Sequence, residues 1–215
     1  MKNILTIDLD FMAKDIRGYN GCIPFEMLED FPKDDNKTLW EATKLVFNMR
    51  FKKDLSEEIL KGTDDFIFRI IENNLDAEYH YVENHNEAVD YFPNEASNVF
   101  NIDFHHDMGY DFNDDQAQNQ INNWVLLGYD DGLIKTYSWI RRATSAFPVQ
   151  VAIPYEHEEW RNINPDKLPK FDMIIIVGSP EFTPKSIYNN FVKRYNKLGL
   201  IQLKEKGEWY NGIWT

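Results

Sequence analysis

A run of five apolar residues in the C-terminal part of the chain constrains the fold more than any other feature. Met173-Ile174-Ile175-Ile176-Val177 carries no polar side chain, and it is far shorter than the ~18 residues that a membrane span needs. A strand that is apolar on both faces is typical of a parallel sheet covered on both sides. We therefore predict a fully buried strand within residues 171–178.

Other short apolar segments alternate along the chain with segments of helical periodicity. Further strands are expected at residues 4–9, 77–82, 98–102, 132–140 and 149–153. Helices are expected at residues 38–49, 54–75 with a break at Gly62, 84–89, around 121–127, and 183–199 with Pro184 at the first helical position. This alternation predicts an α/β fold, a three-layer α/β/α arrangement with a mostly parallel sheet.

The size of the chain fits one ordered domain. It has 215 residues, of which 43% are hydrophobic and 15% aromatic. We expect a single domain over residues 1–215, in which residues 12–38, with scattered glycines, prolines and acids, form an irregular excursion or a lid. The one cysteine, Cys22, excludes an intrachain disulfide, and charge appears too early at the N-terminus for a secretory signal. We therefore expect a cytoplasmic protein.

The charge of the chain limits its partners. Its formal net charge is −13 and its pI is about 4.8. Proteins that track nucleic-acid phosphates need clustered lysines and arginines, so we expect no nucleic acid, and no membrane partner. The negative field suits a metal ion and a cationic small-molecule or peptide substrate. The oligomeric state stays open.

Metal-capable side chains follow three of the predicted strands, and the carboxyl ends of parallel strands meet at one edge of a sheet. If the strand at residues 98–102 continues to residue 107, its period of two puts the side chains of Asp103, His105 and Asp107 on one side of the backbone. Four carboxylates and two imidazoles are too many for one tetrahedral zinc and suit two divalent ions such as Mn²⁺. The predicted metal ligands are Asp8, Asp10, His85, Asp103, His105 and Asp107.

These residues resemble the motifs of the arginase and deacetylase (ureohydrolase) superfamily. Asp103-Phe104-His105-His106-Asp107 is similar to its D-x-H-x-D motif, Asp8-Leu9-Asp10 to its D-x-D motif, and His85 to the single histidine that completes the cluster. The resemblance implies a first metal held by His85, Asp103, Asp107 and Asp8. It implies a second metal held by His105, Asp103, Asp8 and Asp10, so that Asp103 and Asp8 bridge the two ions.

The order of the motifs differs from that of the classical arginases, in which the D-x-D strand follows the D-x-H-x-D strand. Here D-x-D opens the chain, so an arginase/deacetylase-like sheet with a rearranged (permuted) strand order is expected. This order and the short chain resemble a compact branch that includes peptide arginases. Four further segments share the resemblance, namely residues 83–88, 123–125, 137–140 and 179–184. The resemblance implies a manganese-dependent hydrolase of C–N bonds. Through a metal-bridging hydroxide, it would convert an arginine side chain, in a peptide or protein, to ornithine and urea.

Three residues outside the ligand set are candidates for catalysis. Glu181 follows the buried strand and is the first candidate for a carboxylate that grips the guanidinium group, with Asp111 and Glu83 as alternatives. His106 and His157 compete for the role of proton shuttle to the leaving amine. A regular strand would point His106 away from the metals, and His157 lies among glutamates that are typical of a solvated loop.

Three other functions stay open on the sequence alone. Asp8-Leu9-Asp10 also resembles the nucleophile motif of haloacid-dehalogenase phosphatases, a role that leaves the other four predicted ligands unused. A deacylase of the same fold would use the same metals without a guanidinium-binding carboxylate. A non-catalytic, metal-stabilised partner-binding protein would use exposed aromatic residues as its interface, namely Trp124, Trp139, Trp160 and Trp209.

Overall fold

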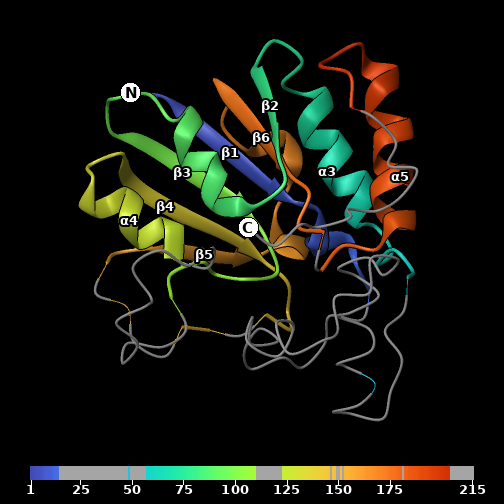
Figure 1. The fold of residues 1–215 in the computed structure, drawn as a ribbon, viewed down its shortest axis with the longest axis horizontal. Coiled ribbons are helices and arrows are strands. Elements are labelled where there is room, and N and C mark those ends of the chain that lie inside the picture. Colours follow the sequence, from blue (N-terminus) through green and yellow to red (C-terminus); the bar gives the residue numbers. More distant parts are fainter. Residues whose placement is uncertain are drawn as a thin grey trace, which may run out of the picture.

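A six-stranded sheet forms the centre of the structure, a computed structural model that describes residues 1–14, 48, 57–109, 123–145, 147–148, 151, 153–180 and 182–203 (Figure 1). The strands run in the order β2-β6-β1-β3-β4-β5, and every neighbouring pair is parallel. An α/β fold with a parallel sheet is therefore confirmed. The strands are β1 (Asn3–Asp8), β2 (Glu78–Val82), β3 (Ser97–Ile102), β4 (Ile134–Arg141), β5 (Glu156–Glu159) and β6 (Met173–Val177).

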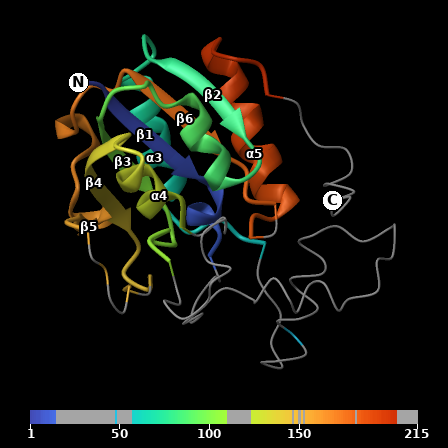
Figure 2. The same cartoon turned by 60° about the vertical axis from the view of Figure 1, so that its left-hand side comes forward.

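Helices cover both faces of this sheet (Figures 1 and 2). On one face lie α3 (Thr63–Glu72) and α5 (Lys185–Tyr195), and on the other lie α4 (Trp124–Asp130) and the 3-10 helix η2 (His85–Tyr91). Strand β6 contributes to both cores, because Ile174 and Ile176 pack on the side of α3 and α5 while Ile175 packs on the side of α4. Burial on both faces explains why its sequence is apolar throughout.

The register of the sheet aligns the carboxyl ends of four strands. Asp8 at the end of β1 pairs with Val177 of β6, and Val177 also pairs with Val82 at the end of β2. On the other side of β1, Ile7 pairs with Ile102 at the end of β3. The residues that follow these strands therefore start from a common edge, where parallel α/β sheets build their sites.

Most predicted helices are present, with shifted ends. Residues 57–61 are not helical, and Gly62, with a φ of 90°, directly precedes α3, so the helix begins after Gly62 and is not interrupted there. Pro184 precedes α5 as its cap rather than occupying the first helical position, and α5 is followed by the 3-10 helix η7 (Asn196–Leu198). Of the helix expected at residues 38–49, only Asn48 is described, and it is helical.

The prediction of a strand at residues 149–153 is not supported where it can be compared. Only Val151 and Ile153 of this segment are described, and neither lies in a strand. The strand that lies next to β4 at the edge of the sheet is instead β5, whose sequence is Glu-His-Glu-Glu. Among the described strands, β5 pairs with β4 alone. Backbone pairing at the sheet edge does not require burial of the side chains, so β5 lacks the apolar pattern by which strands are predicted.

The expectation of exposed tryptophans is wrong for three of the four. Trp124 and Trp139 are fully buried and Trp160 is 8% exposed. Their indoles fill the cores on the two sides of the sheet, as shown by the packing of Trp160 against Phe66 and of Trp124 against Phe92. Trp209 and most of the predicted excursion, residues 15–38, lie outside the described residues. Within the described part of the chain, no helix has the length and apolar character of a membrane span.

Candidate metal centre

Two of the predicted ligands lie where β1 ends. Asp8 is the last residue of the strand, and Asp10 lies in the 3-10 helix η1 (Leu9–Met12) that follows it. The backbone N–H of Asp10 donates to Asp8 Oδ1 at 2.9 Å, which turns the chain tightly enough for both acids to stay at the sheet edge. His85 lies nearby because it is the first residue of η2, three residues after the end of β2.

The other three predicted ligands follow β3 in an irregular segment. The strand ends at Ile102, so the alternation that was expected to put Asp103, His105 and Asp107 on one face does not continue. A turn achieves the convergence instead. The backbone N–H of His105 donates to Asp103 Oδ1 at 2.8 Å, and Asp107 has a φ of 54°, in the left-handed region.

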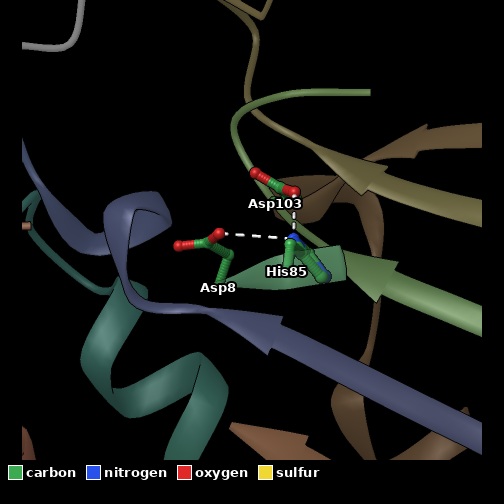
Figure 3. Close-up of side chains that lie close together, drawn as sticks. All are labelled: Asp8, His85 and Asp103. Atoms are coloured by element: carbon green, nitrogen blue, oxygen red, sulfur yellow. Dashed lines mark ion pairs between the residues drawn. The ribbon is translucent and has the colours of Figure 1, made fainter. Parts of the chain in front are cut away.

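Asp8, His85 and Asp103 form the first of two groups that could hold an ion (Figure 3). His85 Nδ1 lies 3.3 Å from Asp8 Oδ2 and 3.1 Å from Asp103 Oδ2. Asp107 lies beside this group, with its Oδ2 2.9 Å from the same nitrogen. All four side chains are buried, so the contacts are formed in a region of low dielectric.

Asp10, Asp103 and His105 form the second group. His105 Nδ1 lies 2.8 Å from Asp10 Oδ2 and 3.8 Å from Asp103 Oδ1. Asp103 therefore belongs to both groups, with Oδ2 directed to the first and Oδ1 to the second. Asp8, which the family resemblance implies as a second bridge, belongs to the first group in the structure. The His105 side chain is 12% exposed, so the second group is the more open one.

Burial and mutual repulsion disfavour the charged forms of the acids. The pKa of Asp8 is raised to about 6, first by burial and then by the charge of Asp10. Burial, together with the charges of Asp107 and Asp10, raises the pKa of Asp103 well above its usual range. Acids packed in this way remain ionised together only when positive charge lies between them.

His85 and Asp107 behave as an ion pair within this cluster. Burial alone lowers the pKa of His85, but the charge of Asp107 and contacts with Asp103 outweigh it, so that pKa is raised well above its usual range. Burial alone raises the pKa of Asp107, but the charge of His85 outweighs it and lowers that pKa. His85 Nδ1 thus lies within 3.3 Å of an oxygen atom from each of three carboxylates.

The donor set fits a divalent cation. Among the described residues, Asp10 Oδ2 and both ring nitrogens of His85 are buried atoms without a hydrogen bond, although His105 Nδ1 lies close to Asp10 Oδ2 and carboxylate oxygens lie close to His85 Nδ1. Buried polar atoms are rarely left in this state. Carboxylate oxygens and imidazole nitrogens are ligands of Mn²⁺ and Zn²⁺, so these buried groups could hold a metal ion.

Hydrogen bonds from neighbouring side chains orient two of the carboxylates. Ser179 Oγ donates to Asp8 Oδ2 at 2.5 Å, and Asn101 Nδ2 donates to Asp103 Oδ2 at 3.2 Å. Asn101 is itself held by Thr6, whose hydroxyl donates to Asn101 Oδ1 at 2.7 Å. Such partners fix the orientation of metal ligands, and none of the three was predicted as a site residue. Two of them carried a signal, because Asn101 lies two residues before Asp103 and Ser179 opens one of the segments that resemble the compact branch.

A third carboxylate receives its hydrogen bond from a tryptophan. Trp124 Nε1 donates to Asp107 Oδ2 at 2.6 Å. Trp124 was expected at an exposed interface only if the protein is a partner-binding one, and its contact with an acid 17 positions earlier was not predicted.

The two histidines predicted as proton shuttles lie in different surroundings. His106 is buried, its Nδ1 accepts from the backbone N–H of Met108 at 3.1 Å, and its ring packs edge-on against Trp139. Burial lowers the pKa of His106 to about 4, so its ring is neutral at neutral pH. His157 is exposed on the edge strand β5, and its Nδ1 accepts from Arg141 Nε at 3.4 Å. Neither belongs to the two ligand groups.

Of the three candidates for a guanidinium-binding carboxylate, Glu181 and Asp111 lie outside the described residues. Glu83 is half-buried and directly follows β2. Its carbonyl oxygen accepts from the backbone N–H of Ser179 at 2.9 Å, so it is next to the residue whose hydroxyl contacts Asp8. Glu83 is therefore the described candidate that lies beside the ligand groups.

The two groups share Asp103, so they could hold two ions side by side. Two divalent ions held a few ångströms apart can activate a water and stabilise the negative charge that develops during hydrolysis. The support for a metal centre is the composition and geometry of the two ligand groups. Comparisons of the chain with protein-family models, with curated proteins and with solved structures found no significant match.

Proposed function

We propose that this protein is a binuclear metal-dependent hydrolase of C–N bonds that acts on a guanidinium group. The observation that supports the proposal best is the position of Asp103 between two histidine-containing groups. Its Oδ2 lies 3.1 Å from His85 Nδ1, and its Oδ1 lies 3.8 Å from His105 Nδ1. A carboxylate shared in this way is suited to bridging two ions, as two-metal hydrolysis requires.

The ligand types favour manganese over zinc. Carboxylate oxygens outnumber imidazole nitrogens in the cluster, and oxygen-rich sites suit Mn²⁺. When bound, the two ions would lower the pKa of a shared water enough for it to act as a nucleophile at neutral pH. Burial of the ligands by the surrounding core limits competing water at the first group.

The remaining steps belong to the protein's own side chains. A carboxylate at the rim would bind the cationic guanidinium through charge-assisted hydrogen bonds, and the candidates are Glu83, Glu181 and Asp111. Addition of water to the guanidinium carbon and cleavage of its bond to the side-chain nitrogen release urea and a protonated amine. With an arginine side chain, alone or in a peptide, the amine product is ornithine. The net charge of −13 favours such a cationic substrate.

We also propose that the fold is an arginase/deacetylase-like one with permuted strand order. The support is the direct pairing of β1, which ends in Asp8, with β3, which leads into Asp103. The two motifs thus lie on neighbouring strands although Asp103 comes 93 positions after Asp10 in the chain. Trp124, Trp139 and Trp160 are buried, so these three residues are not part of the exposed aromatic interface that the partner-binding alternative expected.

The test is a product assay on Mn²⁺-loaded protein with free arginine, arginine-containing peptides and acetyl-lysine peptides. We expect urea and the ornithine product in equal amounts from a guanidinium substrate, and only background release from Asp103→Asn. Asp172→Asn is the matched control, because Asp172 is an acid just before β6, at the opposite edge of the sheet. Acetate without urea would favour the deacylase, and no product from any substrate would contradict the proposal.

A further inference from the structure

One indole contacts both His85 and Asp107. Trp124 is the first residue of α4 and is fully buried. Its Nε1 donates to Asp107 Oδ2 at 2.6 Å. The face of its ring stacks on the His85 imidazole, with ring centroids 4.8 Å apart and an interplanar angle of 26°. The indole therefore restrains a carboxylate through its edge and an imidazole through its face.

Asp107 needs such restraint because its backbone conformation is uncommon. Its φ of 54° is in the left-handed region, which residues other than glycine seldom adopt. The start of α4 holds its backbone as well, since the N–H of Val125 donates to the carbonyl oxygen of Asp107 at 3.3 Å. Two successive residues of α4 thus hold the carbonyl and the carboxylate of Asp107.

Trp124 is itself held rigidly. The rings of Phe92 and Tyr137 pack edge-on against it, at centroid distances of 6.2 Å and 6.1 Å. These contacts come from the end of η2 and from β4, so two elements other than α4 pack against the indole. An indole enclosed in this way can impose an orientation on the groups that it contacts, because close-packed interiors leave it little room to turn.

We propose that Trp124 is a positioning residue for the ion of the first group. The inference rests on the proposed function only in requiring that the cluster bind divalent ions. The indole N–H occupies one lone pair of Asp107 Oδ2, which limits the directions in which that carboxylate can bind a cation. The stacked ring limits rotation of His85, so neither side chain needs to reorganise when an ion enters. Loss of partners of this kind weakens metal affinity by about 10–100-fold.

The test compares Trp124→Phe with Trp160→Phe by Mn²⁺ titration and equilibrium dialysis. Phenylalanine keeps a buried ring at residue 124 but removes the donor to Asp107. Trp160 is the matched control because it is buried against Phe66 and Phe11, in the core on the other side of the sheet. We expect one of the two ions to bind about 10–100-fold more weakly in Trp124→Phe and neither to weaken in Trp160→Phe.

The unsubstituted protein separates failure of this inference from failure of the proposed function. If it binds no divalent ion, the metal-dependent function fails. If it binds two and Trp124→Phe binds both with unchanged affinity, the role of Trp124 is overturned while the function stands. Thermal unfolding of the metal-free variants controls for general destabilisation, because weaker ion binding supports the inference only if Trp124→Phe is folded at the temperature of the titration.

A second measurement avoids the variant at residue 124. In ¹⁵N-labelled protein, an indole N–H bonded to a buried carboxylate should resonate downfield and exchange slowly with solvent. We expect that resonance to shift when Zn²⁺, a diamagnetic probe, is added. It should persist in Trp139→Phe, because the Trp139 indole donates to the backbone carbonyl of Asp103 instead. Indole resonances that are all unchanged at Zn²⁺ saturation would overturn the inference.

Discussion

At the scale of single residues, Asp103 presents its two oxygens in different directions. The amide of Asn101 donates to Oδ2 at 3.2 Å, and the backbone N–H of His105 donates to Oδ1 at 2.8 Å. These donors keep Oδ2 toward His85 and Oδ1 toward His105. The two histidines therefore belong to separate positions that one carboxylate connects, and their removal should have separable effects.

Replacement of either histidine should empty one position and leave the other filled. We expect His85→Ala and His105→Ala each to retain roughly one Mn²⁺ per chain after equilibrium dialysis, because each variant keeps the carboxylates of the other group. His80→Ala is the control, since His80 lies on β2, pairs with Glu78 and belongs to neither group. Loss of both ions from either single variant would show one indivisible centre.

The ligand residues could be predicted because their chemistry is local. Asp8 ends β1, Asp103 directly follows β3 and His85 comes three residues after β2, and the carboxyl ends of parallel strands meet. The expectation that strand alternation brings Asp103, His105 and Asp107 together was wrong, because the strand ends at Ile102 and a turn brings them together. Ser179 and Trp124 could not be found in this way, since a hydroxyl or an indole has no preferred partner until the fold is known.

At the scale of elements, strands could be predicted where their side chains are buried, because burial requires apolar residues. Strand β6 is apolar at every position because both of its faces are covered, whereas β5 is polar because it joins the sheet by backbone pairing at an edge. The order β2-β6-β1-β3-β4-β5 was not predicted. Neighbours in a parallel sheet are chosen by contacts between distant segments, and hydrophobic periodicity carries no information about them.

The packing of α4 on β4 depends on a glycine. A methyl group at Gly128 would lie 2.6 Å from Ile134 Cδ1 and 2.9 Å from Cγ1. Alanine in a helix gains up to about 1 kcal/mol over glycine, but overpacking of a core costs about 1–3 kcal/mol. We expect Gly128→Ala to lower the free energy of unfolding by about 1 kcal/mol in denaturant titrations.

A second substitution tests the cause of that loss. Ile134→Val removes Cδ1, the atom nearest to the added methyl group. In the double variant we expect part of the lost stability to return, with a coupling energy of about 0.5–1 kcal/mol between the two positions. Strictly additive losses would show that the contact between α4 and β4 does not limit the size of residue 128.

At the scale of the whole molecule, the register of the sheet assembles the site. Asp8 and the ends of β2, β3 and β6 lie at one edge, so short segments after these strands bring four carboxylates and two imidazoles together. This cluster is buried in a chain that already carries a net charge of −13. Divalent cations should therefore stabilise the folded state, since ligands of this kind are not assembled in the unfolded chain.

The central claim is that one cluster holds two ions through a shared Asp103. The most direct test is the metal content of protein that has been saturated with Mn²⁺ and freed of unbound ions, measured beside Asp103→Asn and the control Asp172→Asn. We predict about two divalent ions per chain in the unsubstituted protein and the control, and none in Asp103→Asn. An unsubstituted protein with no ion or with one tightly held zinc, or an Asp103→Asn variant that keeps both ions, would contradict the account.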